Sequence, residues 1–419
     1  MSKHKLTTKE NLVPFILISS LFFLWGSAHG MLDVLNAHFQ AVLKISKAES
    51  GLIQFSVYMA YFSIALPAGY FMRRFGYKKG IIAGLLLFSI GSFIIVPASI
   101  NASFHLFLIG LFILGCGLAT LETAANPYTT KLGDKESAER RINFSQSFNG
   151  LAWIFGPIFA TYFILGGEKG NVSSGLESMI APYAGIGIVV FIIAIIYMFV
   201  KLPEITEEDV EIAHGLSDGG QVTETKPLFK TKHLVLGVIA QFCYVAAQTG
   251  VFSFFVNFLT AEELYLGISK TQAGYMLGLG GMSLFFIGRL LGSWMMSFIA
   301  PARLLAIYAF MCVILLPVVS IGLGMVSVVA LFAIFFFMSI MFPTIFALAI
   351  KDLGPQTKKG ASFVIMSIVG GAIFPMFMGW IADISSMSIG FLAPIPLFMF
   401  IVYYAVNGHK VILKLQQSE

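Results

Sequence analysis

The chain has 419 residues, of which 58% are hydrophobic and 11% are charged. Soluble domains carry about 25% charged residues, so lipid rather than water must solvate most of this chain. The formal net charge is +5, but the placement of the positive residues along the chain matters more than their sum. We expect a membrane protein with no nucleic-acid partner.

Apolar runs long enough to cross a bilayer recur along the chain. A bilayer core needs about 20 apolar residues in a helix. Such runs begin near Pro14, Ser50, Gly80, Ser103, Ile142, Met179, Leu234, Thr271, Leu304, Ser327, Gly360 and Ser385. Continuous apolar runs suit helices and not membrane strands. The sequence therefore predicts an all-α integral membrane protein with about twelve transmembrane helices.

The placement of Lys and Arg predicts the orientation in the membrane. If the N-terminus is cytoplasmic, 22 of the 26 Lys and Arg residues fall on the cytoplasmic side or in the inner half of a span. Only Lys44, Lys47, Lys169 and Lys270 fall outside. Since cytoplasmic loops are enriched in Lys and Arg, we expect both termini in the cytoplasm.

The chain divides into two halves that resemble each other. Residues 202–231 form the one long polar segment, which is acidic and has the composition of a flexible linker. Lys47–Gly51, before span two, resembles Lys270–Gly274, which lies 223 residues later before span eight. We predict an N-terminal six-helix bundle (1–201), a cytoplasmic linker (202–231) and a C-terminal six-helix bundle (232–419). Two six-helix halves are the architecture of the major facilitator fold.

Two acidic residues lie inside the predicted spans, Asp33 in span one and Glu122 in span four. A charged carboxylate at the bilayer centre costs at least about 2.5 kcal/mol, so such acids are usually functional. One face of span one, within about 80° of arc, carries Trp25, His29, Asp33, Asn36 and Gln40. A helix end that approaches water could explain Asn36 and Gln40, but it explains Asp33 poorly.

Span four places Glu122 and Asn126 one turn apart on the same face. The next residue, Pro127, has no backbone N–H to donate, so we expect a broken helical turn beside the acid. Irregular backbone in a membrane usually lines a polar cavity. The alternative is that Glu122 pairs with a basic residue and only holds helices together. No Lys or Arg lies in the middle of a span in this half, which favours a functional role.

Spans five and seven add amides and aromatic rings. Span five offers Gln146 and Asn149, and one face of span seven carries Gln241, Tyr244, Gln248, Phe252 and Phe255. Amides donate and accept hydrogen bonds, and aromatic rings stack on the C–H face of a sugar ring. This combination predicts a neutral ligand rich in hydroxyl groups. Hydrogen bonding between helices by single amides is the alternative interpretation.

The sequence lacks the usual motifs of other chemistry. It contains no Walker loop, G-x-S-x-G, C-x-x-C or H-E-x-x-H. The three cysteines lie in apolar runs, with no metal-binding spacing. We therefore expect no enzymatic activity, no ATP-driven transport, no metal site and no cofactor.

The chain resembles the fucose:proton symporter family of the major facilitator superfamily. The resemblance covers nearly the whole chain, and its most specific segment is Leu121–Pro127, with Gln146–Asn149 and Met341–Phe346 in addition. It implies proton-coupled uptake of a monosaccharide across a bacterial inner membrane. It also assigns Asp33 and Glu122 to proton coupling and sugar binding, and places Gln146 and Asn149 near the sugar.

The expected sites and partners follow from these features. For proton coupling we expect Asp33 and Glu122. For substrate binding we expect His29, Asn36, Glu122, Asn126, Gln146, Asn149, Gln241, Tyr244 and Gln248. The partners would be the lipid bilayer and a monosaccharide, either L-fucose-like or a hexose of the glucose/galactose type, and the chain would work as a monomer.

Three alternatives remain open. Sodium could replace the proton, since carboxylates and amides can ligate either ion. A multidrug exporter of the same fold would have a large apolar cavity with few amides. A membrane sensor would need a signalling domain, and the only cytoplasmic segment of any size is the predicted linker.

Overall fold

The computed structural model of the chain describes residues 7–130, 132–133, 138–165, 175–203, 230–296, 298–351, 353 and 357–410. These residues form helices and no strands. Twelve helical spans are long and apolar enough to cross a membrane, and each begins within three residues of its predicted start. The prediction of twelve spans is confirmed. Most of the predicted linker, residues 204–229, lies outside the described part of the chain.

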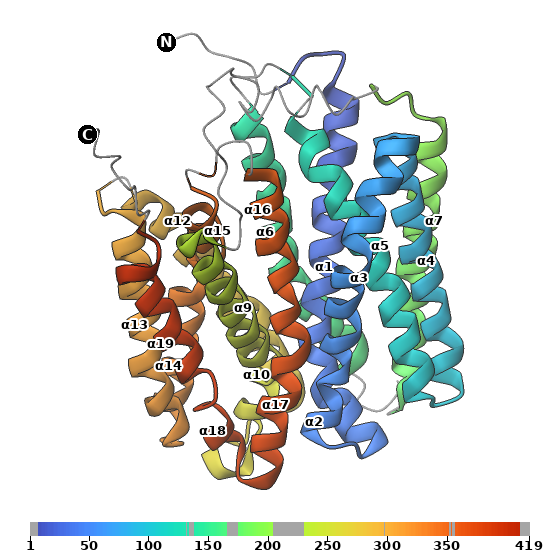
Figure 1. Cartoon of the computed structure of the whole chain (residues 1–419). Helices are drawn as coiled ribbons and strands as arrows, with labels where there is room; N and C mark the ends of the chain where they lie inside the picture. Colours follow the sequence, from blue (N-terminus) through green and yellow to red (C-terminus); the bar gives the residue numbers. More distant parts are fainter. Residues whose placement is uncertain are drawn as a thin grey trace, which may run out of the picture.

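The first six spans form the bundle coloured blue to green in Figure 1. Its elements are α1 (Leu12–Leu43), α2 (Lys47–Ser50), α3 (Leu52–Phe75), α4 (Tyr77–Ile100), α5 (Phe104–Thr130), α6 (Ala138–Ala160), η2 (Thr161–Leu165), η4 (Leu176–Met179) and α7 (Ile180–Phe199). We call this bundle the N-half.

The last six spans form the bundle coloured yellow to red, which lies beside the N-half (Figure 1). We call it the C-half. Its elements are α9 (Lys232–Ser253), α10 (Phe255–Leu259), η6 (Glu262–Leu264), α11 (Lys270–Tyr275), η7 (Met276–Met282), α12 (Ser283–Met295), α13 (Pro301–Ser320), α14 (Met325–Met338), α15 (Met341–Ala349), α16 (Thr357–Met366), η9 (Ser367–Val369), α17 (Gly370–Ile384), α18 (Met387–Gly390), α19 (Ile395–Tyr403) and η10 (Tyr404–Gly408).

Matching capping boxes begin the second span of each half. At the start of α2, the Ser46 side chain accepts from the Glu49 N–H and the Glu49 side chain accepts from the Ser46 N–H. Ser269 and Gln272 make the same reciprocal bonds at the start of α11. Each box satisfies backbone donors that a helix otherwise leaves free at its N-terminus. Ser46 and Ser269 are 223 residues apart, which is the offset of the predicted repeat.

The two halves meet at the end of the bundle that holds α2 and α18, which we call the α2 end (Figure 1). There α2 packs against α17, η2 against α11, and α1 against α9 and α10. A Cβ atom on Gly379 of α17 would lie 2.6 Å from the backbone of Lys47, and one on Gly51 would lie 2.7 Å from the backbone nitrogen of Met376. The helices of the two halves therefore touch backbone to backbone at this end.

The predicted break at Pro127 is wrong, because α5 continues through Pro127 to Thr130. A proline forfeits one backbone hydrogen bond, and neighbouring helices and threonine side chains can compensate for it in a membrane helix. Pro127 leaves the Thr123 carbonyl without its usual helical donor, while the nearby Thr123 and Thr129 hydroxyls donate to the Ala119 and Ala125 carbonyls of the same helix. A break occurs instead in span ten, between α14 and α15.

Candidate functional site

The polar stripe predicted on α1 lies at the contact between the two halves. Asn36 donates from Nδ2 to the backbone carbonyl of Ser253 in α9, at 3.2 Å. Gln40 accepts a hydrogen bond from Asn257 Nδ2 of α10. The part of the stripe that holds Asn36 and Gln40 therefore faces the C-half. Gln40 is partly buried, so a helix end dissolved in water does not account for it.

Asp33 is buried at this contact, at 5% exposure. Its carboxyl group faces the side chains of Gln54 from α3 and Ser253 from α9. Among the described residues, one Asp33 oxygen, both Gln54 amide atoms and the Ser253 hydroxyl are buried without a hydrogen-bond partner of normal geometry. Buried polar groups in proteins normally have partners, so this cluster is suited to an additional proton, ion or water.

His29 lies in a cage of aromatic rings one turn from Asp33 along α1. Its ring is 5.5 Å from that of Tyr61, 6.3 Å from that of Tyr58 and 5.9 Å from that of Trp153, on which it stacks. Its Nδ1 atom lies 3.2 Å from the Trp25 carbonyl oxygen. These contacts hold the imidazole against α3 and α6.

Glu122 lies on α5, where its carboxyl group adjoins the Tyr61 hydroxyl. One turn further along α5, Asn126 accepts a hydrogen bond from Gln146 Nε2 of α6 at 3.3 Å. Asn149 donates to the backbone carbonyl of Phe22 on α1, at 3.2 Å. Gln146 and Asn149 therefore tie α6 to its neighbours within the N-half.

Two of the residues predicted on α9 lie deep in the C-half. Tyr244 is fully buried and donates to the Met338 carbonyl at 3.0 Å. Gln241 is also fully buried, and neither atom of its amide has a partner among the described residues. Gln248 is half-buried. Across the interface, the rings of Trp153 on α6 and Phe252 on α9 are 6.2 Å apart and meet edge to face.

Residues on α3 complete the site and were missed in the sequence. Gln54, Tyr58 and Tyr61 contribute the amide beside Asp33 and the rings beside His29. Their spacing of four and three residues places them on one helical face, which was a signal open to sequence analysis. Ser253 had no such signal, because a single serine in an apolar span does not stand out.

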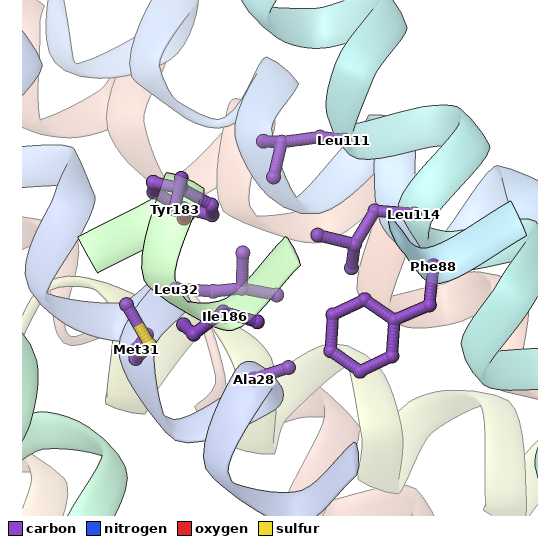
Figure 2. Close-up of a pocket in the computed structure, with 8 residues that line it drawn as sticks. All are labelled: Ala28, Met31, Leu32, Phe88, Leu111, Leu114, Tyr183 and Ile186. Carbon is purple, nitrogen blue, oxygen red and sulfur yellow. The ribbon is translucent and has the colours of Figure 1, made fainter. Parts of the chain in front are cut away.

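Two hollows in the N-half lie away from these polar residues. Figure 2 shows the smaller one, which apolar side chains of α1, α4, α5 and α7 line, among them Leu32, Phe88 and Leu114. Its volume is about 10 Å³, which is too small for a sugar. The larger is a groove of about 840 Å³ between α1 and α6, with Ile16 and Phe144 on its walls. In the described part of the chain, no three His, Cys, Asp or Glu residues form a cluster suited to a metal ion.

Comparisons with known proteins agree on one family. Residues 15–370 match the Major Facilitator Superfamily. The chain is 36% identical to the L-fucose-proton symporter of Escherichia coli over 392 residues, which is 90% of this chain and 88% of that protein. It is also 36% identical to the glucose/galactose transporter of Brucella abortus over 412 residues, which is 97% of each chain.

A solved structure extends the similarity to three dimensions. The crystal structure of the transporter FucP in the outward conformation superimposes with a TM-score of 0.67 at 35% sequence identity. The match covers 95% of this chain and 99% of that chain. A crystal structure of a D-xylose-proton symporter matches with a TM-score of 0.70 at 16% identity, which supports the fold alone.

Proposed function

Since the chain belongs to the Major Facilitator Superfamily, and within it to the family of L-fucose-proton symporters and glucose/galactose transporters, we propose that it imports a monosaccharide together with a proton. It is a multi-pass transporter and not an enzyme. In the proposed cycle a central site opens alternately to the two sides of the membrane as the two halves rock against each other.

The observation that carries the proposal is the position of Asp33. Its carboxyl lies at the contact between the halves, against the neutral groups of Gln54 and Ser253. A charged carboxylate without a cation is costly in this environment. The closed contact in this structure therefore suits an Asp33 that carries a proton, and an ionised Asp33 favours separation of the halves. Such an acid can couple proton binding to the rocking motion.

Glu122 has surroundings suited to a sugar. It adjoins the Tyr61 hydroxyl and lies on the same face of α5 as Asn126, which the Gln146 amide contacts. We assign Glu122 to sugar binding as well as proton coupling, with Asn126, Gln146 and Asn149 beside it. His29 and Asn36 on α1, and Gln241, Tyr244 and Gln248 on α9, complete the proposed binding set. The named relatives make L-fucose and hexoses of the glucose/galactose type the first sugars to test.

We further propose that the protein works as a monomer in a bacterial inner membrane, with both termini in the cytoplasm. The excess of Lys and Arg at the end where α1 begins supports this orientation. The α2 end then faces outside. The coupling ion is the proton in this proposal, and sodium is the alternative that a cluster of oxygen atoms without partners leaves open.

The test uses purified protein in liposomes. A thermal-shift screen against monosaccharides first identifies the sugar. Uptake of that sugar is then measured with an inward proton gradient at zero sodium, and with an inward sodium gradient at constant pH. We expect accumulation in the first case only. Accumulation driven by sodium alone would show that the coupling ion is sodium and not the proton. Binding of dyes in place of sugars would refute the substrate class.

A further inference from the structure

A chain of side-chain hydrogen bonds crosses from the C-half to the N-half at the α2 end. Asn257 Nδ2 donates to Gln40 Oε1, and Gln40 Nε2 donates to Ser50 Oγ at 2.8 Å. The Ser50 hydroxyl donates in turn to the Lys47 carbonyl, at 2.7 Å. Both ends of the Gln40 amide are therefore engaged, one by each half of the protein.

The same chain returns to the C-half through Lys47. The backbone N–H groups of Lys47 and Ala48 donate to the two carboxylate oxygens of Asp383 on α17, at 3.1 and 2.9 Å. The Lys47 ammonium adds an ion pair with Asp383, at 3.6 Å. Gln40 and Ser50 thus connect two contacts that join the halves at different helices.

Asp33 lies on the same face of α1 as Gln40, about two helical turns further from the α2 end. One turn toward the centre of α1 from Gln40, Asn36 donates to the Ser253 carbonyl, and the Ser253 side chain faces Asp33. Asn36 and Ser253 are separated by 217 residues, as are Gln40 and Asn257. The two bonds are therefore successive rungs of one contact between α1 and the α9–α10 segment, and they lie between Asp33 and the α2 end.

We propose that the bonds from Gln40 to Asn257 and Ser50 hold the two halves together at the α2 end and so close the path by which Asp33 reaches that side of the membrane. We call this closed contact the gate at the α2 end, and Gln40 its latch. Gln40 acts as a positioning residue, because it touches neither Asp33 nor the site around Glu122. Removing the Gln40 amide breaks the bond to Asn257. It also breaks the connection between Asn257 and the contact of Lys47 with Asp383. The population of the conformer open at the α2 end then rises.

The test measures how accessible position 253 is from outside. Ser253→Cys places a thiol beside Asp33 and keeps the backbone carbonyl that Asn36 uses. Its labelling by a membrane-impermeant maleimide is followed in sealed right-side-out vesicles, and the chain without this substitution provides the background from Cys116, Cys243 and Cys312. Loss of one buried neutral hydrogen bond changes such an equilibrium about fivefold. We expect Asn257→Ala to raise the labelling rate by about this factor, and Gln40→Ala to raise it at least as much.

The combined variant shows whether Gln40 and Asn257 act through one shared bond or weaken the contact between the halves independently. Gln40→Ala with Asn257→Ala should label no faster than Gln40→Ala alone, because the two residues share one bond. Asn101→Ala is the matched control, since this exposed amide donates to the Pro97 carbonyl of its own helix and, among the described residues, to no other group. It should leave the rate unchanged. Labelling that stays at the parental rate in both Gln40→Ala and Asn257→Ala would overturn the proposal.

A second measurement covers the case in which these variants fail to fold. Gln40→Cys with Asn257→Cys places two thiols on side chains that meet at the α2 end, and a short bis-methanethiosulfonate reagent should join them. The cross-link is detected because the halves stay linked after cleavage at a protease site placed in the 204–229 segment. It should block transport, and reduction should restore transport. Unhindered transport by the cross-linked protein would refute the latch. The proposal rests on the transport cycle proposed above, but labelling is compared at one fixed pH and needs no sugar, so an error in the substrate would not affect it.

Discussion

At the scale of single residues, the two neighbours of Asp33 come from different halves of the protein. The surroundings of this one carboxyl group therefore depend on how the halves are placed. Gln54 belongs to the same half as Asp33, whereas Ser253 belongs to the other half. In the proposed cycle, motion of the halves separates Asp33 from Ser253 and leaves Gln54 in place. The charge that the site tolerates therefore depends on conformation, which is the physical requirement for coupling.

Asp33→Asn should abolish uphill accumulation and spare exchange. Asn imitates the protonated acid, and an exchange cycle needs only loaded conformers. With one proton per sugar, a potential of 100 mV supports about 50-fold accumulation, which the variant should lose. Accumulation under a gradient and counterflow without one are measured in the same liposomes. The exposed acid Glu177, changed to Gln, is the control. Wild-type accumulation by Asp33→Asn would mean that Asp33 is not the coupling acid.

Glu122→Gln should weaken sugar binding as well as coupling. The substitution replaces an acceptor oxygen by a donor in the proposed sugar site, and hydrogen bonds to charged groups contribute about 1.5–3 kcal/mol. We expect the Kd for the sugar to rise about 10- to 100-fold, measured by calorimetry on purified protein. Tyr61→Phe removes the hydroxyl beside Glu122 and should have a smaller effect in the same direction. An unchanged Kd in Glu122→Gln would remove this acid from the sugar site.

At the scale of helices, glycines determine how closely the two halves approach. Gly379 faces the backbone of Lys47, and Gly278 of η7 faces the Ile154 carbonyl of α6, at 2.9 Å from a Cβ placed on it. In lipid, helices associate mainly through such close packing. A side chain at these glycines would meet backbone that cannot move aside as a flexible side chain would, so the gate at the α2 end would close poorly.

Gly379→Ala should therefore favour the conformer open at the α2 end. Overpacking of this kind costs about 1–3 kcal/mol, which corresponds to at least about fivefold faster labelling of Cys at position 253. Gly69→Ala is the control, because a Cβ there meets nothing within 4 Å. The same labelling assay compares the two. Equal rates for Gly379→Ala and Gly69→Ala would show that backbone contact does not limit closure.

At the scale of the whole molecule, an even number of spans predicts that both ends of the chain lie on the same side of the membrane. The charge distribution predicts that this side is the cytoplasm. A cysteine at Ser217 in the linker should resist an impermeant reagent added to intact cells, while a cysteine at the exposed Glu262 should react. Both should react after the membrane is permeabilised. Rapid labelling at position 217 in intact cells would reverse the orientation.

The spans are readable in the sequence because lipid imposes a local requirement on each of them. Every span needs about 20 apolar residues in a helix, and the starts of all twelve were found within three residues. The stripe on α1 was also readable, because helical periodicity places Asp33, Asn36 and Gln40 on one face. Pro127 is the exception, since neighbouring helices decide whether a proline interrupts a membrane helix.

Only the tertiary structure decided which groups meet that stripe. Asn36 and Gln40 find their partners 217 residues away, in Ser253 and Asn257, and Lys47 finds Asp383 336 residues away. Such pairs depend on how the two bundles pack against each other, and hydrophobic periodicity contains no information about that packing. The sequence by itself determined the helices, the repeat and the acids inside the membrane. The docking of the two halves decided that Asp33 lies under a chain of hydrogen bonds at their contact.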